Sequence, residues 1–99
     1  MKVEHRYNGK KEAAYEKLST VLIDLQKQYR NEIGNVYTSW NSSKDIMGFS
    51  FDIRGFTLRG NMILQNGLVI IDGKVPFLAR PFQGKAEKRI KAKLEEILP

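Results

Sequence analysis

Side chains that could carry out chemistry are few in this chain. His5 is the single histidine, and there is no cysteine, so no thiolate nucleophile, disulfide or cysteine metal site is available. No serine stands in a recognisable nucleophile setting, and no metal-ligand spacing occurs. We therefore predict no catalytic residue, no metal and no cofactor. His5 is expected to be a structural or surface residue rather than a base.

Carboxylates are the remaining candidates for acid–base work. Asp45, Asp52 and Asp72 lie within or just before the central part of the chain. Only Asp52 and Asp72 fall on one face of the predicted sheet, and intervening strand positions keep them from sharing a proton. The chain is thus predicted not to be an enzyme.

Basic residues are concentrated near the end of the chain. Residues 74–93 contain seven lysines and arginines and one glutamate, which accounts for the whole net charge of +6. A solvated helix face is the simpler interpretation, and we favour it. The functional alternatives are an anionic surface, an acidic protein or nucleic acid. The candidate contacts for such a partner are Arg80, Lys85, Lys88, Arg89 and Lys91.

The elements that would position these side chains are organised around residues 46–75. Residues 47–53 alternate apolar and polar side chains, which is typical of a strand with one buried face. Two-residue turns at 54–55 and 66–67 would join this strand to two more. Each turn independently puts apolar residues on the same face, so the register is self-consistent. The predicted pairs are Ile53–Phe56, Phe51–Leu58, Phe49–Gly60, Met47–Met62, Met62–Ile71 and Leu64–Val69.

The opposite face of this sheet is mostly polar but contains a row of apolar residues. Ile46, Ile63 and Ile70 are neighbours in the predicted register, and Leu68 lies nearby. Scattered surface residues and a contact strip for a homodimer, lipid or ligand explain the row equally well. Trp40 would extend the row if it pointed outward, although a position in the core is favoured. The candidate strip is Ile46, Ile63, Leu68, Ile70 and Trp40.

Two helices and two further strands complete the prediction. Residues 1–7 alternate as an edge strand with Val3, His5 and Tyr7 on one side, and residues 35–40 form another strand. One helix is expected over about 10–29. A second is expected over about 82–98, after a segment whose two prolines exclude a central strand. Their buried stripes are Ala14, Leu18, Val21, Leu22, Leu25 and Tyr29, and Phe82, Ala86, Ile90, Leu94, Ile97 and Leu98.

The order β-α-β-β-β-β-α predicts a single α+β domain over residues 1–99. Its two layers would be a five-stranded antiparallel sheet and both helices on one face. This order resembles the fold of the TATA-box-binding protein and a short helix-grip fold. A cavity between the layers would suit a carrier of small hydrophobic ligands. No run approaches the ~20 apolar residues of a membrane span, and the charged N-terminus lacks a signal region, so we expect a cytoplasmic protein.

Three short motifs resemble those of the polyhydroxyalkanoic acid system proteins. They are Arg-Gly-Phe-Thr-Leu-Arg-Gly at 54–60, Val-Pro-Phe-Leu at 75–78, and the charged helix ending in Leu-Glu-Glu-Ile-Leu at 94–98. His5 and Gly9 match as well, so the resemblance covers nearly the whole chain. It implies a small bacterial protein linked to polyhydroxyalkanoate storage, with no catalytic residue to carry over.

From the residues and the resemblance together, we expect a non-enzymatic domain that binds a storage granule, a lipid surface or a protein partner. A homodimer formed through the apolar row is included among these partners. The alternatives are a nucleic-acid-binding module that uses the basic last helix, and a small hydrophobic-ligand carrier. Association with granules would then modify the expected cytoplasmic location.

Overall fold

A computed structural model describes residues 1–99 as an α+β fold with one antiparallel sheet. The strands lie side by side in the order β1-β5-β4-β3-β2. The first strand of the chain is therefore an edge strand, as predicted. The strand bounds are β1 Lys2–Arg6, β2 Ile33–Trp40, β3 Ile46–Ile53, β4 Phe56–Gln65 and β5 Leu68–Lys74.

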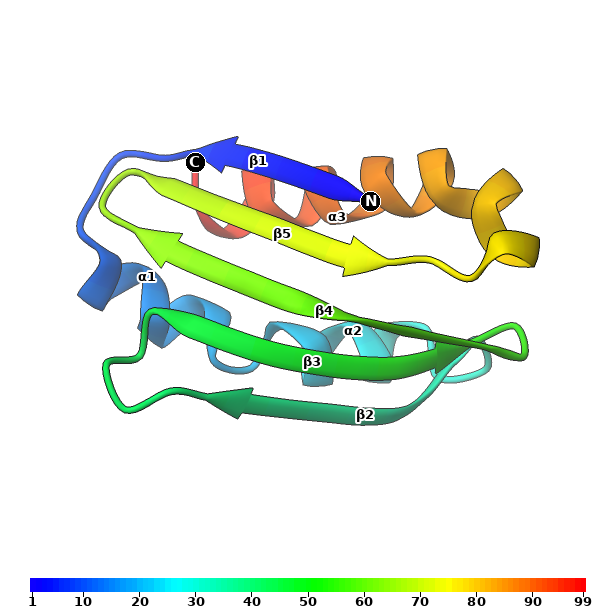
Figure 1. The fold of residues 1–99 in the computed structure, drawn as a ribbon. Helices are drawn as coiled ribbons and strands as arrows, with labels where there is room; N and C mark the ends of the chain where they lie inside the picture. Colours follow the sequence, from blue (N-terminus) through cyan, green and yellow to red (C-terminus); the bar gives the residue numbers. More distant parts are fainter.

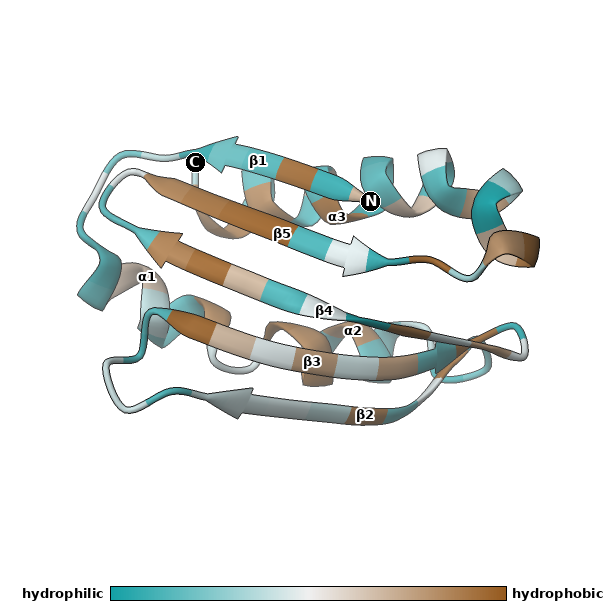
Figure 2. Cartoon of the chain, viewed as in Figure 1, coloured by the Kyte–Doolittle hydropathy of each residue, from teal (hydrophilic) through white to brown (hydrophobic).

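The α-helices lie behind one face of the sheet, in two groups (Figure 1). The helix α2 packs against β2, and α3 packs against β1, so the groups follow opposite edges. Apolar side chains of β3, β4 and β5 point into the space between the layers. The longest hydrophobic stretches lie on β5 and at the end of β4 (Figure 2). The helix bounds are α1 Lys11–Leu18, α2 Val21–Gln28, the 3₁₀ helix η1 Phe77–Phe82 and α3 Gln83–Ile97.

The predicted register of the three central strands is confirmed. All six predicted pairs are partners in the sheet. Arg54 and Gly55 both adopt positive φ, at 50° and 81°, as a tight two-residue hairpin turn requires. Gly67 adopts φ 75° in the second turn. Turn chemistry and apolar alternation thus specified the same sheet.

The single helix predicted over residues 10–29 is wrong in one respect, because it is interrupted. Thr20 leaves the helical region, with φ −115° and ψ 5°, and separates α1 from α2. The Ser19 hydroxyl donates to the Glu16 carbonyl oxygen at 3.1 Å, and the Thr20 hydroxyl donates to Asp24 at 3.2 Å. Such local hydrogen bonds compete with a continuous helical backbone.

The last helix also starts differently from the prediction. Residues 77–82 form the separate 3₁₀ helix η1, and α3 begins at Gln83. Pro81 lies inside η1, and a proline cannot donate the backbone hydrogen bond that a regular α-helix needs there. In η1 only Ala79 is buried. The larger apolar side chains of η1 are exposed to solvent.

Gly60 marks the closest backbone approach within the sheet. It lies opposite Phe49, on the face that the helices cover. A Cβ atom at Gly60 would clash with the Asp72 carbonyl oxygen and would lie 2.9 Å from Phe49 Cζ. The absence of a side chain therefore lets the Phe49 ring cover the sheet at this point.

We predict that Gly60→Ala lowers the free energy of unfolding by about 2 kcal/mol or more, because the new methyl group meets backbone that cannot move aside. Urea unfolding followed by circular dichroism measures this change. The matched control is Gly48→Ala, whose Cβ would have its nearest neighbour at an ordinary 3.7 Å. Equal stability of the two variants would contradict the close packing at Gly60.

Candidate functional site

His5 has a structural position in the fold. Its side chain is buried, with 5% of its surface exposed. Its Nε2 donates to the Leu98 carbonyl oxygen at 2.5 Å, across 93 residues of sequence. Lys91 Nζ donates nearby to the Glu4 carbonyl oxygen. These two bonds attach α3 to the edge strand β1, and this is the structural kind of role that we predicted for His5.

The aspartates do not form a catalytic pair. Asp52 and Asp72 lie on the same face, but their partners on β4 are Thr57 and Asn61, four residues apart. Asp52 accepts hydrogen bonds from Asn35 Nδ2 and Thr57 Oγ1, both at 2.7 Å. These bonds, Asn35 first, lower the pKa of Asp52 below its ordinary value of 3.8. A carboxylate held ionised in this way is unsuited to act as a general base near neutral pH.

The apolar row on the uncovered face of the sheet lies in the predicted register. Ile46 pairs with Ile63, and Ile63 pairs with Ile70. Ile46 is 42% exposed, while Leu68 lies half-buried two residues before Ile70 on β5. These four residues are therefore adjacent on an open surface. Their use as a contact strip stays a prediction.

Trp40 does not belong to this strip. It pairs with Met47, whose side chain is buried beneath the helices, so Trp40 lies on the covered face. Its ring meets that of Tyr15 edge to face, with centroids 4.8 Å apart. Including Trp40 in the candidate strip was wrong, and the favoured core position holds because strand pairing fixes which face each residue takes.

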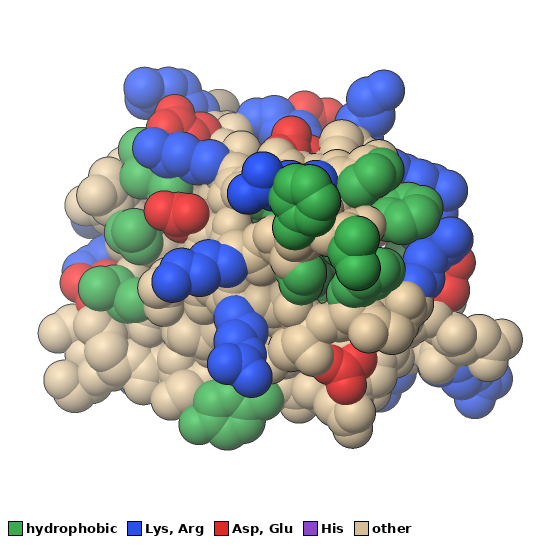
Figure 3. Space-filling model, turned by 45° about the vertical axis from the view of Figure 1, so that its right-hand side comes forward, with side chains coloured by type: hydrophobic (Ala, Val, Ile, Leu, Met, Phe, Trp, Pro, Cys, Tyr) green, Lys and Arg blue, Asp and Glu red, His purple; other side chains and the backbone are tan.

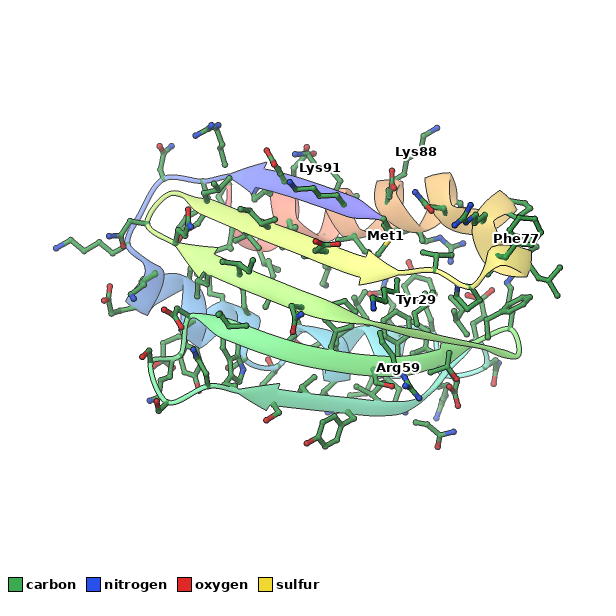
Figure 4. All side chains as sticks on the ribbon, viewed as in Figure 1. Met1, Tyr29, Arg59, Phe77, Lys88 and Lys91 are labelled. Carbon is green, nitrogen blue, oxygen red and sulfur yellow. The ribbon has the colours of Figure 1, made fainter.

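The predicted basic patch is divided between two surfaces. Lys88 and Lys91 lie on the side of α3 next to β1, as Figure 4 shows, together with the acidic Glu4 and Glu87. Lys85 and Arg89 instead border a cavity beneath η1. Arg80 belongs to η1 itself. The five residues thus do not present one continuous basic face.

The two most exposed apolar residues, Phe77 and Leu78, lie in η1 with the less exposed Phe82, and we call these three residues the apolar tip. Their exposed fractions are 76%, 74% and 46%. Figure 3 shows hydrophobic side chains gathered at this end of the molecule, with lysines and arginines beside them. The prediction that Phe82 belongs to a buried stripe was wrong, because it ends the 3₁₀ helix instead of starting α3. Exposed apolar clusters of this kind typically mark interaction sites.

Arginines flank the apolar tip. The Arg80 guanidinium lies 5.5 Å from the Phe77 ring centroid, and that of Arg54 lies 5.8 Å from the Phe82 ring centroid. Sequence reasoning missed this surface, although one signal was present. Two prolines enclose Phe77 and Leu78 within a segment too short to form an amphipathic helix, so these side chains had no obvious core to enter.

A second feature is a cavity of about 110 Å³ that lies between α2 and α3, over the covered face of the sheet. We call this cavity the slot. A smaller cavity of about 70 Å³ lies beside it, under η1. Side chains from both helices and from the sheet form the walls of the slot, among them Leu22, Leu25, Phe51, Met62, Ile90 and Leu94.

Glu32 connects two arginines at the edge of these cavities. Arg54 Nη2 lies 3.2 Å from Glu32 Oε1, and Arg89 Nη1 lies 3.4 Å from Glu32 Oε2. The Arg89 guanidinium also lies 5.2 Å from the centroid of the Tyr29 ring. Arg89 borders both cavities and Arg54 borders the smaller one, and Glu32 bridges these two guanidinium groups.

Comparison with protein families gives a match over residues 1–98 to the family described as "Putative polyhydroxyalkanoic acid system protein". The chain belongs to this family. The resemblance seen in the short sequence motifs is thereby confirmed. In this polyhydroxyalkanoic acid system protein, the apolar tip, the slot and the sheet all lie inside the matched region.

Other comparisons add no relative, since no curated protein and no solved structure gives a significant match. The likeness to the TATA-box-binding protein and to helix-grip folds therefore stays a prediction. Each helix of this polyhydroxyalkanoic acid system protein is too short or too polar to cross a membrane.

We predict that Thr57→Val raises the pKa of Asp52 toward its ordinary value, because one of two donated hydrogen bonds is lost. The lowered pKa of the folded state stabilises the fold above the unfolded pKa, and this contribution disappears as the pH falls through the folded value. Carbon-13 NMR titration of the carboxyl groups measures the change. Asp72 is the internal control, and an unchanged Asp52 titration would refute the assignment.

Proposed function

We propose that this protein is a non-enzymatic binding domain that attaches to the hydrophobic surface of a polyhydroxyalkanoate granule through its apolar tip. The observation that supports the proposal is the exposure of Phe77 and Leu78, each about three-quarters accessible to solvent. Membership of the polyhydroxyalkanoic acid system family makes a polyester surface the natural apolar partner.

The energetics of the tip suit reversible attachment. Burying a Phe or Leu side chain contributes roughly 2 kcal/mol, so the three tip residues together offer several kcal/mol before the cost of immobilising the protein. The tip is a short 3₁₀ helix held between β5 and α3, which means that little chain has to be ordered on binding. The domain would therefore attach as a rigid wedge.

Basic residues around the tip would add attraction to an anionic coat. Arg80 lies over Phe77, Arg54 lies over Phe82, and Lys85 borders the cavity beneath η1. Each lysine or arginine near an anionic lipid surface contributes about 1 kcal/mol. The protein would therefore bind a negatively charged granule or lipid layer more tightly at low salt.

The second candidate function is binding of a protein partner, including a second copy of this chain, to the uncovered face of the sheet. The observation that favours it is the direct pairing of Ile46, Ile63 and Ile70 across three strands on a face without helices. Nucleic-acid binding has less support, because Lys88 and Lys91 lie beside acidic groups, away from Lys85 and Arg89.

We predict that Phe77→Ser with Leu78→Ser reduces binding to polyhydroxyalkanoate particles more than tenfold, because about 2 kcal/mol of apolar burial is lost at each position. Co-sedimentation of the purified protein with particles, and with anionic liposomes at low salt, measures the effect. The thermal midpoint should barely change, since both side chains are largely exposed in the free protein.

The matched control is Ile46→Thr with Ile63→Thr, which makes the other apolar surface more polar while keeping residues suited to strands. Full binding by this control, together with loss by the tip variant, supports the apolar tip. The reverse pattern would place the contact on the sheet. If the unaltered protein binds neither particles nor liposomes at low salt, the proposed attachment is refuted.

A further inference from the structure

The slot and the cavity beneath η1 are adjacent spaces. Met1, Ile53, Leu58, Ala86 and Arg89 border both of them. Together they extend along most of α3, from Gln83 beside η1 to Leu94. A narrow ligand could therefore enter beside η1 and lie along the helix.

The side chains that line the two cavities specify the chemistry of such a ligand. Sixteen of the eighteen residues around the slot are hydrophobic, and the other two are Arg89 and Lys93. The polar residues around the smaller cavity are Arg54, Gln83, Lys85 and Arg89. Neither cavity is lined by an acidic residue. An apolar body with one negatively charged end matches this distribution.

Glu32 shows where the charged end of the ligand would be held. Its two oxygens lie 3.2 Å from an Arg54 nitrogen and 3.4 Å from an Arg89 nitrogen. The Glu32 side chain is about one-third exposed, and those of the two arginines are about half exposed. A ligand can therefore displace Glu32 from the arginines without unfolding the protein. A ligand carboxylate could replace Glu32 against Arg89 with similar charge-assisted hydrogen bonds.

The size of the cavities limits the length of the ligand. Volumes of about 110 and 70 Å³ compare with an engineered cavity of about 150 Å³ that holds benzene. They would accommodate one chain of roughly four to eight carbons. All three methionines, Met1, Met47 and Met62, border the slot. Their flexible side chains allow the walls to adapt to a chain of this kind.

We propose that the slot binds an unbranched carboxylic acid, with the carbon chain among the methionines and the carboxylate on Arg89 and Arg54. Phe82 of the apolar tip lines the smaller cavity, but Phe77 and Leu78, the two residues changed in the tip variant, border neither cavity. The ligand class has two sources, membrane lipids and hydrolysed polyester, which share the apolar chain and the terminal carboxylate.

The test is a titration of the full chain with sodium octanoate, followed by NMR of protein labelled with carbon-13 in the methionine methyl groups. Since every methionine borders the slot, we expect saturable shifts of the Met47 and Met62 signals. Arg89→Gln should weaken binding about three- to tenfold. Glu32→Gln should strengthen it by a similar factor, because the competing carboxylate is removed.

The matched control is Lys88→Gln, which removes the same charge from α3 on the side next to β1. It should leave the affinity for octanoate unchanged, and so should the tip variant Phe77→Ser with Leu78→Ser. Equal weakening by Arg89→Gln and Lys88→Gln would overturn the carboxylate site. Retained octanoate binding by a tip variant that has lost particle binding would separate this site from the proposed granule attachment.

A parallel titration with 3-hydroxyoctanoate distinguishes the two sources of the acid. Tighter binding of the hydroxy acid indicates a polyester product, whereas tighter binding of octanoate indicates a lipid product, and either result supports the site. The absence of methionine shifts with both acids would overturn it.

Discussion

The arrangement of this protein depends on how its helices share the covered face of the sheet. The helix α2 packs against β2 and α3 packs against β1, which are the two outermost strands. Strands are ~4.8 Å apart, so opposite edges of a five-stranded sheet lie ~19 Å apart. Helices in direct contact have axes only about 8–10 Å apart. The helix α1 contacts the central strand β4, but between α2 and α3 the middle of the sheet is covered by side chains.

The positions of both helix groups are set by contacts distant from the slot. His5 and Lys91 attach α3 to β1 through backbone carbonyl oxygens, and a connection of only a few residues leads from α2 into β2. The side chains between them have to fill the remaining width, and they do so incompletely. Arg89 and Tyr29 approach each other across the opening. A cavity with a charged rim is thus a consequence of where the helices are attached.

Much of the sheet could be predicted from the sequence because two kinds of local information agreed. The turns at 54–55 and 66–67 fixed the register, and the alternation of apolar residues fixed the buried face. Less could be predicted where several weak preferences compete. Ser19 and Thr20 interrupt the first helix although the apolar period continues through them. The sequence favours a core position for Trp40, but only its pairing with Met47 fixes the face on which it lies.

The candidate sites were less predictable than the fold, because each depends on residues that are distant in sequence. Glu32, Arg54 and Arg89 meet only after three separate elements have packed, and no spacing in the chain indicates this. The basic residues after Lys74 were recognisable as a group, but α3 turns alternate members toward opposite sides. A charge count therefore cannot distinguish a continuous patch from two surfaces.

The apolar tip and the cavity beneath η1 have a common cause in the prolines that precede α3. Pro76 and Pro81 delay the helix by the length of η1, and this segment extends past the sheet instead of covering it. Phe77, Leu78 and Phe82 consequently remain exposed, while the cavity beneath η1 stays partly open. If an α-helix began at Pro76 and packed on the sheet, the same apolar residues could close that space. The segment that costs the fold some buried surface is therefore the one that provides the apolar tip and the cavity beside the slot.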